Sequence, residues 1–569
     1  MSKRVADVIF PNLPKTYAEY EAQYPPRNCA ATRFAPSPTG FMHIGGLYTA
    51  LINCLFAKRN GGVFFLRIED TDQKRQVENG VTEIIHTLHD FSIRFDEGPA
   101  GETGDYGSYG PYRQSLRREI YQAYAKYLLE KDLAYPCFCS RAELHAANAP
   151  QAYPCFCTEE DGVQLRQRQE EENALQKGYY GKWAVCRNLT EEQVLEKLAQ
   201  GQSYVLRLRS PGVDGKFRVF YDELRGDISM PENVMDAVII KQDGLPTYHF
   251  AHVVDDHLMH TSDVIRADEW IASLPLHVQL FETLGFPVPR YTHLSPIAKL
   301  EPKEDGESFS RRKLSKRKDP EARVHYYDEI GYPVAAVLDY LLTISSADYE
   351  PWREENPDAP ITDFPLDVKR TGIAGSLFDF NKLNSIARGR VAHMSCGEVY
   401  EAVRTWAAKY DGKLSSYIEA ESDRFRRSIP VWHDNRLDVA KWSDLMQMYP
   451  YLYDAGYRID EIPMPEKFAA HAQRISSILR DYLEGFDPSD DSAAWFDKLR
   501  AIATKYNYAV KMGQYKKHPE DFNGSIADVS SFVRFAITGC TNTPDLHQII
   551  QVIGGEEAGR RVEKFCERF

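Results

Sequence analysis

Two patterns of apolar residues divide the chain near residue 390. Before it, short runs of β-branched and aromatic residues, such as 63–68, alternate with helical periodicity, as at 47–58 and 80–91. This alternation is typical of a parallel α/β sheet. Beyond residue 390 no strand alternation is visible, and apolar residues recur at helical spacing over 397–409, 466–484, 492–506 and 556–568. The pattern predicts an α/β part followed by an all-helical part.

The α/β alternation is interrupted over 116–230 by a segment of different composition. It begins with a helical run at 116–130 and includes a cysteine-rich segment and a charged helical run at 161–176. Strand-like runs follow at 203–208 and 217–221, and the α/β pattern resumes with 234–240. An insertion of mixed α+β structure inside the α/β part accounts for this order. Before the first strand, residues 1–30 form an extension with one expected helix at 15–24.

Composition describes a water-soluble chain of several domains. Its 569 residues exceed what one hydrophobic core organises, and 43% hydrophobic and 27% charged residues are ordinary values for globular proteins. No run approaches the roughly 20 apolar residues of a membrane span, and the first residues lack the apolar core of a signal peptide. Ten cysteines are too few for a disulfide scaffold in this length. We therefore expect a cytoplasmic protein with no membrane partner.

A stiff loop before a helix is the most informative stretch of the chain. Pro36 and Pro38 fix the backbone of this loop, and Gly45 and Gly46 fall where the helix begins. A helix N-terminus offers N–H groups and a positive dipole end to a phosphate, and His43 adds a donor there. A Pro-Gly turn before an ordinary helix is the alternative interpretation, which an isolated motif of this length would not exclude.

A basic run far downstream decides between these interpretations. Residues 313–317 read Lys-Leu-Ser-Lys-Arg and follow a polar run at 301–312 that predicts a flexible loop. With His-Ile-Gly-Gly at 43–46, this run resembles the two signatures of class I aminoacyl-tRNA synthetases, HIGH and KMSKS. Further motifs resemble the glutamyl branch of bacterial type: Arg-Phe-Ala-Pro-Ser-Pro-Thr-Gly (33–40), Leu-Arg-Ile-Glu-Asp-Thr-Asp (66–72), Gly-Pro-Tyr-Arg-Gln-Ser (110–115), Val-Val-Asp-Asp-His (253–257) and Asp-Val-Ile-Arg-Ala-Asp-Glu-Trp (263–270).

The resemblance implies a domain organisation. It implies an α/β Rossmann-type catalytic domain with an inserted α+β acceptor-binding domain, followed by an all-α stem-contact and anticodon-binding half. The expected boundaries are 1–30 for the extension, 31–115 and 231–300 for the split catalytic domain, 116–230 for the insertion, 301–390 for the KLSKR loop and stem-contact region, and 391–569 for the anticodon-binding domain. The net charge of −14 suits a protein that binds tRNA through a local basic surface and repels other RNA.

The resemblance also implies a reaction. It implies ATP-dependent joining of L-glutamate to tRNA(Glu) through an adenylate, with Mg²⁺ held mainly by the phosphates. Charge develops on phosphoryl oxygens, so donors and cations carry this chemistry, and His43 and Lys316 are the expected catalytic residues. The remaining expected ATP-binding residues are Gly45, Gly46, Lys313, Ser315 and Arg317. The second histidine of the HIGH signature is replaced by Gly46, so one donor toward the phosphates is lost.

Glutamate selection needs a cation for the side-chain carboxylate and an anion for the ammonium group. Arg266 stands where the glutaminyl branch has an uncharged residue, and it is the strongest sequence evidence for glutamate. Glu69 matches the acidic position that faces the ammonium group. The other residues that match glutamate-contacting positions are Arg33, Ser37, Tyr248 and His252. Asp255 and Asp256 resemble a metal pair, but we expect them to cap the segment after a strand at Tyr248 and to orient nearby groups.

The cysteine-rich segment leaves two interpretations open. A hexapeptide, Ala-Tyr-Pro-Cys-Phe-Cys, occurs at 134–139 and again at 152–157, which indicates a local duplication. Some relatives bind structural zinc in this region through a C-x-C pair and later ligands, whereas free thiols are the alternative. The candidate zinc ligands are Cys137, Cys139, Cys155, Cys157 and Cys186.

Competing functions remain within and outside the family. A glutaminyl-tRNA synthetase is disfavoured by Arg266 and by the helical C-terminal half. A glutamyl enzyme that also charges tRNA(Gln) is compatible with the same residues. A paralogue that only binds tRNA is disfavoured because His43 and Lys316 are retained. The family resemblance further implies a monomer.

Overall fold

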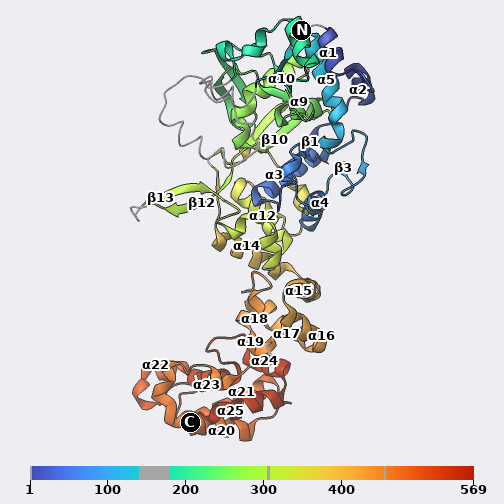
Figure 1. The fold of residues 1–569 in the computed structure, drawn as a ribbon. Coiled ribbons are helices and arrows are strands. Elements are labelled where there is room, and N and C mark those ends of the chain that lie inside the picture. The colour runs from blue at the N-terminus through green and yellow to red at the C-terminus, as the bar shows by residue number, and fades with distance from the viewer. Residues whose placement is uncertain are drawn as a thin grey trace. The chain divides into compact units, whose positions relative to one another are not determined.

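The computed structural model describes residues 3–139, 179–303, 308–373, 375–436, 438–453 and 457–568 (Figure 1). These residues form two compact units. The first, here called the catalytic unit, comprises 1–326 and 341–378, and the second, the helical unit, comprises 327–340 and 379–569. In the described ranges, no helix has both the length and the apolar character needed to cross a lipid bilayer.

A parallel sheet organises the catalytic unit. Strand β1 (Ala31–Phe34) pairs in parallel with β2 (Val63–Leu66), and helix α3 (Ile44–Arg59) makes the crossover between them. The amphipathic helix α4 (Gly80–Asp90) follows, with its apolar side buried. The expected strand at 63–68 and helices at 47–58 and 80–91 are confirmed with small shifts at their ends.

The second strand pair of this sheet comes from more than 190 residues further along the chain. Strand β10 (Asp263–Ala267) is parallel to β11 (Arg290–Leu294), and helix α10 (Leu274–Leu284) joins them. The Ser262 amide donates to the Ala31 carbonyl at 3.1 Å, which places β10 beside β1. The carboxyl ends of these strands therefore lie together, as expected for a ligand site in an open α/β sheet.

The segment between the two strand pairs forms its own antiparallel structure. Helix α5 (Arg118–Glu130) leads into β5 (Ala134–Cys137), which pairs with β6 (Val205–Leu208). Strand β9 (Val238–Ile240) then pairs antiparallel with β6, so the expectation that 234–240 returns to the parallel sheet is wrong. A hairpin of β7 (Phe217–Asp222) and β8 (Gly226–Pro231) follows β6.

Helix α8 (Glu191–Ala199) begins with a capping box at Thr190 and Gln193. The expected charged helix at 161–176 and the second copy of the hexapeptide, at 152–157, lie outside the described residues.

The N-terminal extension is helical and packs on the catalytic unit. Helix α1 (Lys3–Ile9) was not expected, whereas α2 (Tyr17–Gln23) fulfils the expectation at 15–24. Glu21 on α2 accepts a hydrogen bond from the Tyr124 hydroxyl at 2.6 Å. Arg27 forms a bidentate pair with Glu97, at 2.8 and 2.6 Å, so the extension is anchored by a charge pair as well as by apolar contacts.

Both described ends of the polar run before Lys-Leu-Ser-Lys-Arg belong to strands. Strand β12 (Ile297–Pro302) pairs antiparallel with β13 (Phe309–Lys313), where the sequence predicts a flexible loop. A short strand, β14 (Ser376–Leu377), adds to β12 in parallel. The helices that follow the loop are α11 (His325–Glu329), α12 (Val334–Ser345), α13 (Tyr349–Glu355) and α14 (Phe380–His393).

The helical unit contains no strand among its described residues, as the apolar spacing predicts. Its core joins buried aliphatic and aromatic side chains from most of its helices, with Trp432 the largest fully buried one. After α14, the described helices of this unit are α15 (Cys396–Tyr410), α16 (Gly412–Ala420), α17 (Ser422–Arg436), α18 (Asp444–Met448), α19 (Pro450–Tyr453), α20 (Ala472–Gly485), α21 (Ser492–Lys505), α22 (Met512–Lys517), α23 (Ile526–Thr538), α24 (Leu546–Ile553) and α25 (Gly555–Cys566).

One glycine of the helical unit tests this packing. Gly331 has φ +82°, and a Cβ built on it would lie 2.9 Å from the ring of Trp406 and 2.9 Å from Cβ of Trp442. We expect Gly331→Ala to destabilise the helical unit by about 2–4 kcal/mol, because left-handed strain and overpacking add. Chemical denaturation followed by tryptophan fluorescence measures this change.

A matched glycine provides the control. Gly412 is exposed at the start of α16, and a Cβ there would meet no atom within 4 Å. Gly412→Ala should leave the midpoint unchanged or raise it slightly. Equal midpoints for the two variants would contradict the packing described for Gly331.

Candidate active site

His43 joins the loop before α3 to the basic run at 313–317. Its Nδ1 accepts a hydrogen bond from the Gly45 amide at 2.9 Å, so the proton resides on Nε2. Nε2 donates to the Leu314 carbonyl at 3.0 Å. Burial, with Lys313 and Lys316 nearby, lowers the pKa of His43 although the bond to Leu314 opposes this, so the ring is neutral at pH 7. The two sequence signatures therefore meet through one imidazole.

The amides at the start of α3 already have partners in this structure. Gly45 donates to the His43 ring, and Gly46 donates to the His43 carbonyl at 2.8 Å. A Cβ at Gly45 would lie 3.2 Å from Nδ1 of His43, whereas one at Gly46 would make only ordinary contacts. A side chain at Gly45 would therefore crowd the His43 ring, which would have to shift by a few tenths of an ångström.

The basic loop is held by acidic side chains. Asp319 accepts hydrogen bonds from the Ser315 amide at 2.9 Å and from Arg312 at 2.7 and 2.9 Å. Lys313 pairs with Glu269. Lys316 and Arg317 are exposed on the same loop. The chain then returns to the first signature, since the Val324 amide donates to the Met42 carbonyl at 3.0 Å.

A second group of site residues surrounds the buried carboxylate of Asp256 on helix α9 (Tyr248–Leu258). Asp256 accepts from Arg33 at 3.2 Å and from Arg67 at 2.6 Å, and it lies 2.8 Å from Nδ1 of His252. Burial by itself would raise the pKa of Asp256, but the two arginines hold it well below its usual range. The charge of Arg33 is therefore balanced inside the protein.

Glu69 and Tyr248 lie close to this network. Glu69 is buried beyond the end of β2, where it accepts a hydrogen bond from Arg67 at 3.3 Å. Burial raises the pKa of Glu69 to about 7, against the opposing charges of Arg67 and Arg33. Burial and the charge of Glu69 also raise the pKa of Tyr248 to about 12. Glu69 is thus a carboxyl that titrates near neutrality.

Arg266 lies on β10 and is bound differently from Arg33 and Arg67. Its Nε donates to Nε2 of His293 at 2.9 Å, and Nη1 donates to Nδ1 of His277 at 3.0 Å. Nη2 donates to the Trp270 carbonyl at 3.3 Å, and the guanidinium lies 4.8 Å from the centre of the Tyr291 ring. In the described part of the chain, no carboxylate forms an ion pair with Arg266.

The structure thus brings together most of the residues expected to contact glutamate, with two differences. Ser37 is exposed on the loop after β1, and among the described residues its side chain forms no hydrogen bond with the group around Asp256. Tyr248 is the first residue of helix α9 and not part of a strand, so Asp255 and Asp256 belong to the helix and do not cap it. The structure adds Arg67, His277 and His293 to the site.

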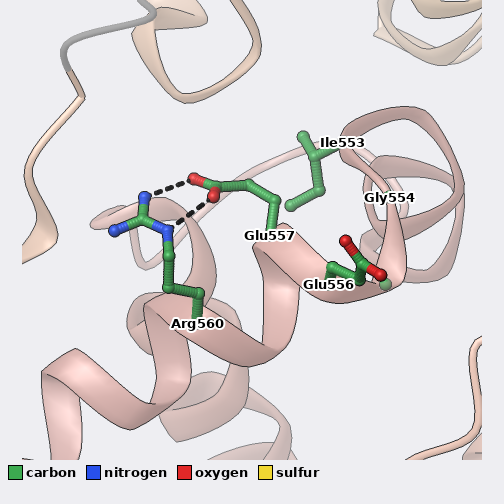
Figure 2. Close-up of a pocket in the computed structure, with 6 residues that line it drawn as sticks. Ile553, Gly554, Glu556, Glu557 and Arg560 are labelled. Carbon is green, nitrogen blue, oxygen red and sulfur yellow. Dashed lines mark hydrogen bonds and ion pairs between the residues drawn. The ribbon is translucent and has the colours of Figure 1, made fainter.

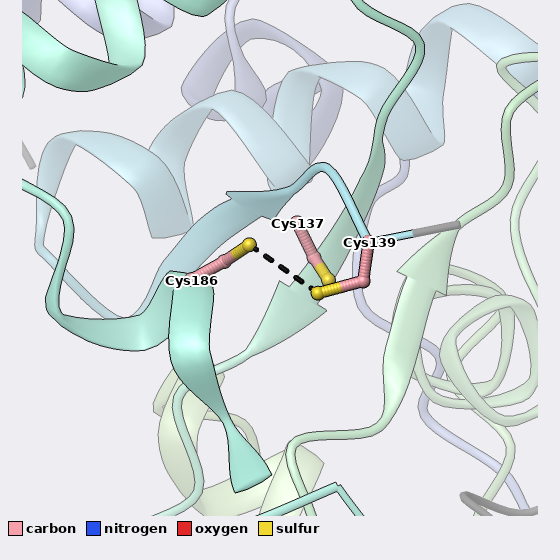
Figure 3. Close-up of side chains that lie close together, drawn as sticks. All are labelled: Cys137, Cys139 and Cys186. Carbon is pink, nitrogen blue, oxygen red and sulfur yellow. Dashed lines mark hydrogen bonds between the residues drawn. The ribbon is translucent and has the colours of Figure 1, made fainter. Parts of the chain in front are cut away.

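Three cysteines of the insertion come together (Figure 3). The sulfur atoms of Cys137, Cys139 and Cys186 all lie within 4.8 Å of one another. The Tyr179 hydroxyl is 3.3 Å from Sγ of Cys137 and 3.3 Å from Sγ of Cys139. Hydrogen bonds from Cys139 and Cys186 lower the pKa of the Cys137 thiol well below its usual range. Cys155 and Cys157 lie outside the described residues.

A shallow hollow of about 440 Å³ in the helical unit lies at the start of α25 (Figure 2). Its charged residues include Glu557 and Arg560, which pair with each other at 2.7 Å along the helix. Since that pair is one helical turn apart and satisfied, the hollow offers no chemistry comparable to that of the catalytic unit.

Comparison with known proteins agrees with the fold and the two signatures. A family model described as the catalytic domain of class I tRNA synthetases (E and Q) matches residues 30–151 and 148–350. The site in the catalytic unit is therefore that of a class I tRNA synthetase.

Relatives that match along the whole chain identify the family within this class. A glutamate–tRNA ligase of Clostridium beijerinckii is 43% identical over 99% of this chain and 99% of its own length. One from Acetivibrio thermocellus is 41% identical, again over 99% of both chains. A crystal structure of a glutamate tRNA ligase from Elizabethkingia meningosepticum in complex with its amino acid matches with a TM-score of 0.71 at 26% identity, covering 95% of this chain and 99% of that one. The chain belongs to the glutamate–tRNA ligase family.

Proposed function

We propose that the chain joins L-glutamate to tRNA(Glu) in two steps. A glutamate carboxylate oxygen attacks the α-phosphorus of ATP and releases pyrophosphate, and a terminal ribose hydroxyl of the tRNA then displaces AMP from the glutamyl adenylate. The observation that carries this proposal is the relation to glutamate–tRNA ligases over 99% of the chain. The burial of Arg266 without an ion-paired carboxylate among the described residues supports glutamate as the amino acid.

We assign the first step to the residues around His43. Negative charge grows on the phosphate oxygens, so positioned N–H donors and cations lower its barrier. Nε2–H of His43 would exchange the Leu314 carbonyl for a phosphate oxygen, and Lys316 would approach from the basic loop. The other expected ATP-binding residues are Gly45, Gly46, Lys313, Ser315 and Arg317. Magnesium, when bound with ATP, would be held mainly by phosphate oxygens and would neutralise part of their charge.

We assign glutamate recognition to the group around Asp256. Glu69 would receive the ammonium group, and Arg266 would receive the side-chain carboxylate in a charge-assisted pair. Arg33 would orient its free N–H groups toward the substrate while Asp256 balances its charge. Tyr248, His252 and Ser37 would line the same site.

The parts of the chain would divide the tRNA between them. We propose that the insertion around β5, β6 and β9 binds the acceptor end and that the region after the basic loop contacts the stem. The helical unit would bind the anticodon. The charging of tRNA(Gln) by the same enzyme is the second candidate function, because the amino-acid site described here would serve both tRNAs.

The cysteine cluster fits a structural zinc ion. The three thiols are ligands of the kind that structural zinc takes. The Tyr179 hydroxyl, 3.3 Å from the sulfur atoms of Cys137 and Cys139, would be the fourth donor of a tetrahedral site. A thiolate at Cys137 is already favoured by its neighbours. We propose that Cys137, Cys139, Cys186 and Tyr179 hold one zinc ion that fixes the insertion.

The proposed reaction is tested with Lys316→Ala. We expect adenylate formation, measured as glutamate-dependent ATP–pyrophosphate exchange with tRNA(Glu) present, to fall at least a hundredfold, because the variant loses a cation that acts mainly in the transition state. Wild-type enzyme should use glutamate and not glutamine.

Lys318→Ala is the matched control, since Lys318 is an exposed lysine of the same loop outside the signature. It should change the exchange rate by less than about threefold. Wild-type activity with glutamine alone would contradict the function, whereas equal rates for the two lysine variants would contradict only the role of Lys316.

A pH profile tests Glu69. With its pKa raised to about 7, the carboxyl is protonated below that pH and cannot pair with an ammonium group. We expect kcat/KM for glutamate to rise with pH through about 7, since this ratio reports ionisation in the free enzyme. Glu69→Gln should lower kcat/KM and remove this rise. An unchanged profile in the variant would assign the ionisation to another group.

Metal analysis tests the zinc proposal. We expect about one zinc ion per chain in the purified protein and none in Cys139→Ser, because thiolate ligands dominate zinc affinity. Cys540→Ser, in the helical unit, should keep its zinc. Zinc-free wild-type protein with titratable thiols at 137, 139 and 186 would favour the alternative of free cysteines.

A further inference from the structure

Arg266 differs from the three buried arginines that surround Asp255 and Asp256 in what balances its charge. Arg33, Arg67 and Arg117 each form an ion pair with Asp255 or Asp256. Arg266 is equally buried, at 5% exposed, yet its described partners are two histidine rings, a carbonyl and an aromatic face. An unbalanced buried charge is costly, so such an arrangement is expected where a ligand supplies the counter-charge.

The protonation of the two histidines follows from their partners. Arginine can only donate, so Nε2 of His293 and Nδ1 of His277 must both be lone-pair acceptors. His293 then carries its proton on Nδ1, which donates to Asp222 at 2.7 Å. His277 carries its proton on Nε2, which donates to Nδ1 of His249 at 2.8 Å. Both rings are fully buried, and burial lowers the pKa of His293 to about 4 and that of His277 well below its usual range.

The fold fixes these rings independently of any substrate. His293 is the register partner of Arg266 on the neighbouring strand β11, so their side chains share one face of the sheet. Asp222, at the end of β7, also accepts from the His293 amide at 3.0 Å and from the amides of Leu224 and Arg225. His277 is held within α10, against α9.

We propose that His277 and His293 are positioning residues for substrate selection, which orient Arg266 through neutral acceptors and leave its positive charge unbalanced for the side-chain carboxylate of glutamate. Of the five guanidinium N–H groups, the described protein contacts use three, one on each nitrogen. Nη1 and Nη2 each retain one N–H that a carboxylate oxygen can accept. This inference rests on the proposed function and adds the reason for its charge specificity.

The decisive test compares two substitutions of equal size. In His277→Asn, the amide oxygen can replace Nδ1 as a neutral acceptor, whereas His277→Asp places a carboxylate at the same position. We expect KM for glutamate to be at least tenfold higher in the Asp variant than in the Asn variant. The ratio of kcat/KM for glutamate to kcat/KM for glutamine should fall in proportion, because the introduced carboxylate competes for Arg266 with the charged side chain of glutamate and not with the neutral side chain of glutamine. KM for ATP and the melting temperature should be alike in both variants.

Asparagine and glutamine are also compared at both histidines, so that the conclusion does not depend on how well one site tolerates mutation. Glutamine places its amide oxygen near Nε2 of histidine, and asparagine places its amide near Nδ1. At His293, which accepts through Nε2, Gln should therefore be milder than Asn. At His277, which accepts through Nδ1, Asn should be milder than Gln. A merely structural role would follow side-chain volume and favour Gln at both positions.

The outcomes separate this inference from the function itself. Equal KM for glutamate in His277→Asn and His277→Asp, or Gln milder than Asn at both sites, would overturn the positioning role while wild-type activity with glutamate still stands. If the variants at one histidine do not fold, the pair at the other decides. Wild-type enzyme that does not use glutamate would overturn the function instead.

Discussion

The buried carboxylates of Asp255 and Asp256 hold the catalytic unit together. Two adjacent charges on α9 bind arginines from β1, from the end of β2 and from the start of α5, so one helical turn fixes three elements. Such a network is not a large net source of stability, because burying the charges costs about as much as pairing them returns. Its value lies in geometry, since a shift of any element would leave a buried charge without a partner. The positions of Arg33, Glu69 and His252 follow from that constraint.

The second constraint is the contact between the two signatures. His43 caps α3 with one ring nitrogen and holds the basic loop with the other, so the loop carrying Lys316 is tethered to the helix that would face ATP. The tether is a single hydrogen bond from a neutral ring to a carbonyl, worth about 1 kcal/mol. A bond of that strength keeps the loop near its working position and can be exchanged for a phosphate oxygen without a large barrier.

The sequence predicts those parts of the structure that are local or carried by contiguous motifs. The helix after His43, the strand before Glu69 and the helical second half follow from periodicity and from the Pro and Gly residues between elements. The antiparallel pairing of β9 and the hairpin of β12 and β13 do not, because pairing partners are set by the tertiary fold. His277 and His293 belong to no short motif and meet Arg266 only through sheet register and helix packing. His252 and Asp256 were both expected from motifs, and their spacing of four residues on one helix could also have revealed their contact.

Asp222 lies at the end of β7, within the segment inserted into the α/β part, yet its carboxylate sets the tautomer of a histidine that contacts Arg266. The inserted segment therefore cannot be exchanged without affecting the residues around Arg266. A chimaera that exchanged this segment between relatives along the boundaries suggested by sequence would also exchange the carboxylate that holds His293 beside Arg266, in the proposed glutamate-binding group. Transplants meant to alter only the choice of tRNA would need to retain the β7–β8 hairpin, and comparison of natural relatives should find the hairpin and the pocket histidines changing together.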